Sequence, residues 1–238
     1  MAEITKNQGD EKLRQEFNSW ASDGRGEEME SHHISIAEQT IAKMDLKPGD
    51  CVLDLGCGAG WATRIVAKAV AGKRGEQEGS AVGLDVSDEM IARARAGSKE
   101  VENAAFVWGS AAEIPWQNDY FDKVLSIESF YYYPDQEKVL DDVRRVMAPG
   151  AKLYILINLY RENHYSLRWV GELKVAVHVR GEQEYKQMLE QHGFHDVKIE
   201  HVPDLTPSPD TYSGKWFKSA EELKDFKKIG ALLLIATK

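Results

Sequence analysis

The sequence predicts a single α/β domain built on a doubly wound, mostly parallel sheet. Three observations support this: short apolar runs alternate with amphipathic stretches, a glycine-rich loop follows the first apolar run, and 238 residues suit one large domain. Apolar strands separated by helices imply right-handed crossovers, which give a parallel sheet with helices on both faces. We therefore expect one domain over residues 1–238, without internal repeats.

The N-terminal 45 residues are expected to form a helical cap outside the sheet. The first thirty are polar and contain one short amphipathic patch, Leu13–Phe17–Trp20. Apolar residues then recur at helical spacing between His32 and Met44. The sheet core is expected to follow over residues 46–159.

Five strands alternate with helices in this core. The expected strands are Cys51–Leu55, Ala81–Asp85, Ala105–Trp108, Lys123–Ile127 and Lys152–Leu159. Helices are expected over Trp61–Ala71, after the N-cap Ser87, and from the N-cap Asp135 to a stop at Pro149-Gly150. The polar segment 73–80 is expected to be a surface loop.

The C-terminal third adds further elements and two insertions. The pattern predicts a helix over Glu182–His192, a strand around Val197 and Ile199, a charged helix near Ser219–Lys228 and a final apolar strand over Ala231–Thr237. Residues 160–180 and 203–228 lie between these elements and are expected to form lid segments over a substrate pocket.

Composition and charge narrow the functional classes. The apolar fraction is 42%, and 39 acidic residues against 30 basic ones give a formal net charge of −9. A surface of that sign repels phosphate backbones, so no nucleic-acid partner is expected. No apolar run reaches the roughly 18 residues of a membrane span, and the polar N-terminus lacks a secretory signal. These features predict a cytoplasmic protein without a membrane partner, with Cys51 and Cys57 reduced.

The most informative segment is the loop DLGCGAGW, residues 54–61, between the first strand and the first helix. Ligands bind open α/β sheets in the crevice at this edge, and glycines let the backbone approach them closely. The dinucleotide fingerprint G-x-G-x-x-G, started at Gly56, needs a glycine where this chain has Trp61. The loop therefore departs from the dinucleotide pattern.

Two carboxylates favour a cationic nucleoside as the ligand. Asp54 precedes the loop, where its charge repels a pyrophosphate but attracts an ammonium group. Asp85 ends the second strand, where it can accept hydrogen bonds from both ribose hydroxyls. S-adenosylmethionine carries an ammonium and a sulfonium but no phosphate, so the residues predict it as the cofactor.

Four motifs resemble those of class I S-adenosylmethionine-dependent methyltransferases: DLGCGAG, GLDVSDEM, GSAAEIPWQNDYFDKVLS and the Pro149-Gly150 turn before LYIL. The sequence is most similar to the small-molecule branch called type 11, which resembles the ubiquinone and menaquinone biosynthesis enzymes. The resemblance covers residues 47–159 and extends more loosely through QMLEQHGFHDVKI. It implies a Rossmann-like, seven-stranded, mostly parallel sheet with an antiparallel last strand, here Ala231–Thr237.

The resemblance also implies cofactor contacts at the strand ends. The glycine loop would surround the methionine moiety, Asp85 the ribose, Ala111 the adenine, and Ile127 the methyl group. From its own place in the helix after Asp85, Met90 could lie on the adenine face or belong to the core. The chain departs from the family at Gly109-Ser110-Ala111, where an aspartate often accepts from the adenine amino group; the backbone or Glu113 could substitute. The predicted cofactor-binding residues are Asp54, Gly56, Gly58, Gly60, Asp85, Met90, Ser110, Ala111 and Ile127.

Three residues are candidates for catalysis. Glu128 follows the fourth strand and suits a general base or ammonium recognition, or alternatively a contact to the N-terminal segment. His33, beside His32, suits a base near neutral pH, or a surface position. Tyr132 belongs to the run ESFYYYP, which either floors a pocket or packs under the next helix. No His, Cys or Asp cluster has metal-ligand spacing, so no metal is expected.

Three functional hypotheses follow. The first is methyl transfer to a small-molecule acceptor by in-line displacement, in which the protein supplies positioning and, where the nucleophile must lose a proton, a base. The second is a nicotinamide-dependent oxidoreductase, against which Asp54 and Trp61 argue. The third is a non-catalytic subunit that binds S-adenosylmethionine. An exposed aromatic lid would also suit a homodimer contact.

Overall fold

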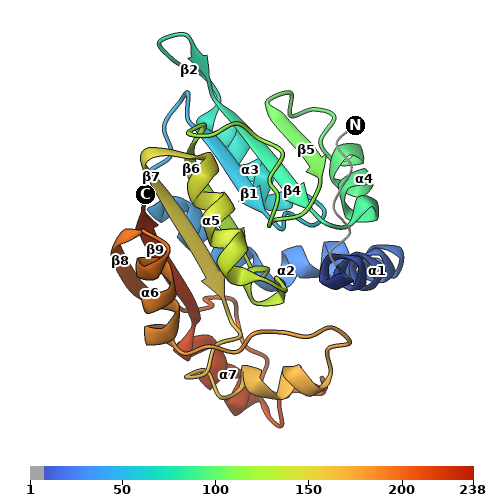
Figure 1. The fold of residues 1–238 in the computed structure, drawn as a ribbon. Coiled ribbons are helices and arrows are strands. Elements are labelled where there is room, and N and C mark those ends of the chain that lie inside the picture. The colour runs from blue at the N-terminus through green and yellow to red at the C-terminus, as the bar shows by residue number, and fades with distance from the viewer. Residues whose placement is uncertain (1–7) are drawn as a thin grey trace.

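The computed structural model describes residues 8–238 and confirms the doubly wound α/β architecture (Figure 1). Seven strands form one sheet in the order β5-β4-β1-β6-β7-β9-β8. Their bounds are β1 Cys51–Leu55, β4 Ser80–Asp85, β5 Ala104–Trp108, β6 Phe121–Ile127, β7 Met147–Ile157, β8 His195–Val202 and β9 Ala231–Thr237. The last strand, β9, runs antiparallel to β7 and β8, as expected. Residues 1–7 of the expected N-terminal cap lie outside the described residues.

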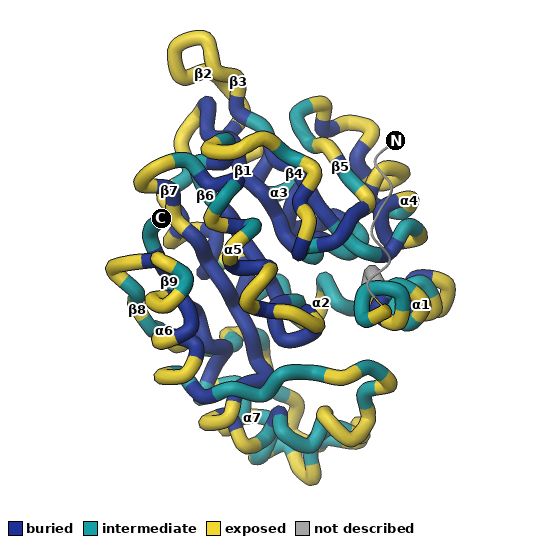
Figure 2. Tube along the Cα trace, viewed as in Figure 1, coloured by how far each residue is buried: buried dark blue, intermediate teal, exposed yellow. Residues whose placement is uncertain are grey.

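Helices cover both faces of the sheet, so its inner strands β4, β1, β6 and β9 are largely buried, whereas the edge strand β8 is mostly exposed or half-buried (Figure 2). On one face α2 (Arg25–Lys43) and α3 (Trp61–Val70) pack on a cluster that includes Val52 of β1. On the other, α5 (Gln136–Val146) and α6 (Glu182–Gln191) pack on a cluster that includes Leu53. Adjacent residues of β1 thus pack into the hydrophobic cores on opposite faces of the sheet, as the two-residue period of a strand requires.

Side-chain caps begin three helices. Ser87 accepts a hydrogen bond from the backbone N–H of Met90 at 3.0 Å and starts α4 (Asp88–Ala96). Asp135 and Ser219 do the same for α5 and for α7 (Ala220–Ile229). Each cap satisfies one of the N–H groups that the first helical turn leaves unpaired. The expected caps Ser87 and Asp135 are confirmed.

The N-terminal region is more helical than predicted. The polar first thirty residues contain α1 (Gln8–Ser22), and α2 begins at Arg25 rather than near His32. The patch Leu13–Phe17–Trp20 is the inner face of α1, with Leu13 and Trp20 buried. Packing of this apolar face stabilises a helix whose remaining surface is polar.

Two further expectations were partly wrong. The segment 73–80 lies on the surface as predicted, but it is not a loop throughout, because it contains a short hairpin, β2 (Lys73–Arg74) and β3 (Gln77–Glu78). Strand β7 begins at Met147 and runs through Pro149-Gly150, which was expected to precede it. A register shift between Phe121 and Lys123 of β6 accommodates this irregular start, because proline cannot donate to a regular ladder.

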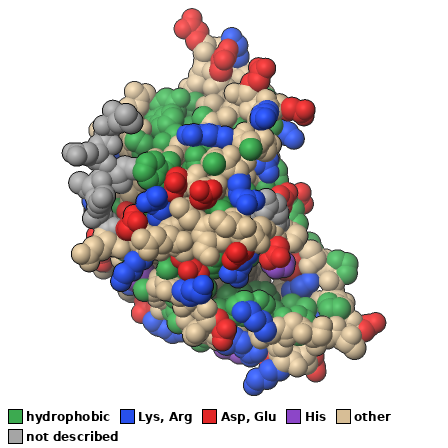
Figure 3. Space-filling model, turned by 90° about the vertical axis from the view of Figure 1, so that its right-hand side faces the viewer, with side chains coloured by type: hydrophobic (Ala, Val, Ile, Leu, Met, Phe, Trp, Pro, Cys, Tyr) green, Lys and Arg blue, Asp and Glu red, His purple; other side chains and the backbone are tan. Residues whose placement is uncertain are grey.

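Charges of both signs share the surface. On the face drawn in Figure 3, acidic and basic side chains are interspersed rather than segregated.

Both cysteines are free and buried. Within residues 8–238, no helix is long and apolar enough to span a membrane.

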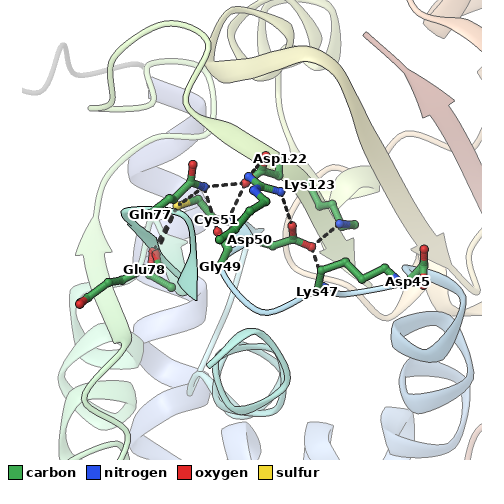
Figure 4. Close-up of polar contacts among 11 residues, drawn as sticks. Asp45, Lys47, Gly49, Asp50, Cys51, Gln77, Glu78, Asp122 and Lys123 are labelled. Atoms are coloured by element: carbon green, nitrogen blue, oxygen red, sulfur yellow. Dashed lines mark hydrogen bonds and ion pairs between the residues drawn. The ribbon is translucent and has the colours of Figure 1, made fainter. Parts of the chain in front are cut away.

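The amino edge of the sheet carries a network of paired charges (Figure 4). Asp50 directly precedes β1, is 1% exposed, and accepts from Lys123 and from Arg74 Nη1, the latter at 2.9 Å. Arg74 also binds Asp122 at 2.8 Å, and Gln77 donates to the same carboxylate at 3.0 Å. The small hairpin is therefore joined to the sheet by its own polar side chains.

Candidate functional site

The glycine loop turns sharply at the carboxyl end of β1. The N–H groups of Gly56 and Cys57 both donate to the carbonyl of Leu84 in β4, at 2.8 and 3.0 Å. Gly56 has φ +76°, and a Cβ there would lie 2.4 Å from that of Ser129. Gly58, with φ +52°, has open space on its Cβ side. At these glycines the loop therefore presents backbone, without side chains, to the space beside it.

Asp54 and Asp85 flank this loop as carboxylates with perturbed pKa values. Asp54 is 2% exposed and accepts from Thr63 Oγ1 at 2.6 Å; burial raises its pKa to about 6. Asp85 accepts from the N–H groups of Gly58 and Ser87, both at 2.8 Å, and burial also raises its pKa. Desolvation penalises the charged form of both side chains.

This pair fits a cationic ligand. Among the ion pairs formed within residues 8–238, none includes Asp54 or Asp85. A buried carboxylate without a cation is costly, and an approaching ammonium or sulfonium would relieve that cost. A pyrophosphate would add two negative charges to the same place. The charge of the site therefore suits S-adenosylmethionine and opposes a dinucleotide.

A cavity of about 540 Å³ extends from the loop to the C-terminal segments. Its lining includes seven of the predicted cofactor-binding residues: Asp54, Gly56, Gly58, Asp85, Met90, Ala111 and Ile127. Gly60 and Ser110 lie outside the lining. Gly60 instead permits close packing, since a Cβ there would lie 2.4 Å from Phe106 Cε1.

Glu128 lies in the cavity wall directly after β6. Its backbone adopts φ +52°, and its carboxylate accepts from Tyr131 Oη at 3.0 Å and from the N–H of Asn158 at 2.5 Å. Burial raises its pKa to about 7 in spite of these hydrogen bonds. A carboxyl group with that pKa is ionised in part at neutral pH and is basic enough to take a proton.

The other two catalytic candidates also line the cavity. Burial lowers the pKa of His33 to about 4, so its ring is neutral and less basic than Glu128. Burial raises the pKa of Tyr132, which is therefore protonated at neutral pH. Its ring packs edge-on against Phe17 and Trp20 of α1, with centroids 5.0 and 6.5 Å away. The tyrosine run thus anchors the N-terminal helix and contributes to the cavity at once.

An aromatic wall, supplied by the two expected lid segments 160–180 and 203–228, closes the far side of the cavity. The cavity lining there includes Trp169, Tyr212, Trp216, Phe217 and Phe226. Trp169 lies 6.3 Å from Trp216 and 5.5 Å from Phe226, and its buried Nε1 has no hydrogen-bond partner among the described residues. Both expected lid segments thus supply cavity residues, while their role as lids stays a prediction.

A family model described as a methyltransferase domain matches residues 46–200. The chain belongs to this family. It is also similar, at 30% identity with a TM-score of 0.84, to a putative methyltransferase solved in complex with the Haloferax volcanii Trm112 methyltransferase activator; the match covers 93% of this chain and 97% of that one. A SAM-dependent methyltransferase from Aquifex aeolicus shares the fold at 20% identity, with a TM-score of 0.63 over 90% of this chain and 97% of that one.

Curated relatives point to one branch of the family. A demethylmenaquinone methyltransferase from Shouchella clausii is 35% identical over 126 residues, or 52% of each chain. One from Bacillus cereus is 28% identical over 195 residues, which cover 70% of this chain and 79% of the relative. This chain spans about half the length of the first of these relatives. The predicted family, including its menaquinone-like branch, is confirmed, and the matched proteins do not favour an oxidoreductase.

Proposed function

We propose that this protein transfers the methyl group of S-adenosylmethionine to a small organic acceptor with a flat, largely apolar body. The observation that carries the proposal is the continuous cavity, which joins the cation-seeking carboxylates Asp54 and Asp85 to an aromatic wall. The curated relatives support a quinol-like acceptor, since they are demethylmenaquinone methyltransferases.

The cofactor supplies an activated methyl group, and the chain supplies position and proton transfer. Asp54 and Asp85 would hold the ammonium and ribose, respectively, so that the methyl group faces the end of β6. Glu128, one residue beyond Ile127, would take the proton that a hydroxyl or acidic carbon of the acceptor loses as the new bond to carbon forms. Tyr131 and Asn158 fix its carboxylate in the wall while this happens.

The acceptor half of the cavity supports an oxygen-bearing aromatic compound. Trp169, Trp216 and Phe226 all line the cavity, and Trp169 packs edge-to-face against the other two, so this wall offers aromatic contact to a planar body. The unpaired Nε1 of Trp169 is a buried donor, and a buried donor without a partner costs about 1–3 kcal/mol. A carbonyl or hydroxyl oxygen of the acceptor would satisfy it.

A labelling experiment tests the proposal. The purified protein is incubated with methyl-labelled S-adenosylmethionine and reduced naphthoquinones or a small-molecule extract, and products are analysed by mass spectrometry. We expect label in a low-molecular-weight product. Label found only in protein or nucleic acid would exclude a small acceptor, and binding of S-adenosylhomocysteine without any transfer would favour a non-catalytic subunit.

Substitution of Glu128 tests its role as the base. In Glu128→Gln we expect kcat to fall by about 10²- to 10⁴-fold while the affinity for S-adenosylhomocysteine is unchanged. The wild-type rate should rise as the pH rises through about 7, because the carboxyl group must lose its proton first. The exposed Glu137→Gln serves as the control. A variant that keeps the wild-type rate and pH profile would contradict the assignment.

We also propose that the chain assembles with a Trm112-type activator protein. Support comes from the Haloferax volcanii complex, whose putative methyltransferase matches this chain over nearly its whole length. Co-expression with such an activator, followed by size-exclusion chromatography, should give a stable one-to-one complex. Elution of this 26.8 kDa chain by itself would argue against it, and elution at twice that mass would instead support the predicted homodimer.

A further inference from the structure

The order of the strands determines how a nucleoside ligand must lie. Asp85, at the end of β4, pairs in register with Trp108 of β5, so Gly109 and Ser110 follow beside it. Asp54 lies on β1, on the opposite side of β4. A ligand with its ribose at Asp85 and its cationic end at Asp54 therefore extends its base toward the loop after β5.

The cavity near this loop suits a flat base but needs a hydrogen-bond acceptor. Its lining there includes the apolar side chains of Leu13, Val86, Met90 and Ala111. Adenine differs from other purines by its 6-amino group, which is a donor. An acceptor in the wall would therefore select adenine.

Neither of the two side-chain acceptors considered from the sequence, Ser110 and Glu113, lines the cavity. The Ser110 hydroxyl donates to Asp10 Oδ2 at 2.6 Å and accepts from the N–H of Ala112 at 3.1 Å. Glu113 forms an ion pair with Lys138 at 3.0 Å, and both side chains are about half exposed. A side-chain acceptor for the amino group must therefore come from another part of the cavity wall.

Asp10 of α1 lies in the cavity lining next to this loop. Ser110 holds its Oδ2, whereas its Oδ1 makes no hydrogen bond within residues 8–238. The helix that carries it is fixed nearby: Arg14 binds Asp88 at 2.8 Å, and Asn18 Oδ1 accepts from Ser87 at 2.6 Å. Figure 1 shows α1 beside α4, at the carboxyl ends of β4 and β5.

We propose that Asp10 recognises the adenine amino group of the cofactor and that Ser110 is the positioning residue for its carboxylate. The inference rests on the proposed S-adenosylmethionine site. The adenine subsite is then completed by a helix that precedes the sheet, and the serine after β5 acts through that helix rather than on the base. Adenine selectivity depends on α1 being docked.

The test compares S-adenosylhomocysteine with S-inosylhomocysteine, in which a carbonyl oxygen replaces the 6-amino group. Calorimetry on the full chain should show that the wild type prefers the adenosyl ligand by about 10- to 100-fold, because a carboxylate repels the carbonyl. In Asp10→Asn the preference should shrink to about 3-fold or less, since an amide can donate to that carbonyl as well as accept from the amino group. Glu11→Gln, on the adjacent half-buried carboxylate that pairs with Arg14, should keep the wild-type ratio.

The ratio of the two dissociation constants separates recognition from folding. If Asp10→Asn leaves the ratio unchanged, whether both ligands bind more weakly by the same factor or neither changes, Asp10 only holds α1 and the proposal is overturned. Ser110→Ala, checked for folding by circular dichroism, should weaken adenosyl binding by a few-fold and lower the ratio. Wild type that binds neither ligand would overturn the cofactor site itself, whereas intact selectivity without methyl transfer would overturn only the catalytic part of the proposed function.

Discussion

Two buried aspartates lie toward opposite ends of strand β1, and only one of them is paired with basic side chains. Asp50, before the strand, is 1% exposed and paired with Lys123 and Arg74. Asp54, within the strand, is 2% exposed and, among residues 8–238, has only the hydroxyl of Thr63 as a side-chain partner. Burial raises the pKa of Asp54 to about 6. At the amino edge of the sheet, basic side chains of the protein neutralise the buried carboxylate. At the carboxyl edge the buried carboxylate is left for a cationic ligand to neutralise.

This difference separates a structural site from a binding site. A buried carboxylate with protein cations around it holds elements together, here the β2–β3 hairpin and the start of β1. A buried carboxylate without such cations destabilises the ligand-free protein, and it favours binding of a cationic ligand that fits the site. Substitution by asparagine should therefore have opposite consequences at the two positions.

The largest effect is expected from Asp50→Asn. Removing this charge leaves Lys123, which is 14% exposed, without its buried partner, and such losses cost about 3–5 kcal/mol. Urea denaturation at neutral pH should show a lower free energy of unfolding by about that amount. Asp45→Asn, a carboxylate 78% exposed in the same loop, should change it by less than about 0.5 kcal/mol. Equal effects at the two positions would mean that the network does not stabilise the edge.

Asp54→Asn is expected to stabilise the ligand-free protein. The folded pKa of about 6 lies above the usual value of 3.8, so the unfolded chain loses this proton first and stability falls as the pH rises from about 4 to 6. The neutral variant avoids this cost, which is at most about 3 kcal/mol at pH 7.5 and close to zero at pH 4. Denaturation at both pH values measures the difference. A variant that is less stable than wild type at pH 7.5 would contradict the view that this charge is uncompensated.

The affinity for S-adenosylmethionine should depend on the same proton. The cation binds the ionised carboxylate, so affinity is full above pH 6 and falls by up to about 10-fold for each pH unit below it. Calorimetry between pH 5 and 7.5 tests this, with Asp54→Asn as the matched control. The variant should bind more weakly at neutral pH and lose most of the pH dependence. A wild-type affinity that is constant over this range would show that Asp54 does not face the cation.

The sequence predicted the parts of the site that follow from local pattern. Asp54 and Asp85 were found because each lies at the end of a short apolar run, and such runs reliably mark buried parallel strands. The bounds of β1 and β9 match the prediction for the same reason. By contrast, the pKa of His33 depends on burial by segments far away in the chain, which no local pattern reveals.

The missed features depend on tertiary contacts. Helix α1 is polar except for one narrow face, and it is ordered by packing on Tyr132 and by bonds to Ser87 and Asp88. The spacing of Leu13, Phe17 and Trp20 was the available signal. The contact between Asp10 and Ser110 spans 100 positions, so sequence alone could show only that an expected aspartate was missing.

The smallest effect is expected from Arg74→Gln at the paired edge. The Arg74 side chain is 49% exposed, so its ion pairs with Asp50 and Asp122 are screened by solvent and worth about 1 kcal/mol or less. Lys123 still neutralises Asp50 in this variant, whereas Asp50→Asn removes the centre of the network. Denaturation of the two variants in parallel, at low and at high salt, measures both effects. A loss with Arg74→Gln as large as that with Asp50→Asn would mean that the hairpin, rather than the buried carboxylate, holds the amino edge together.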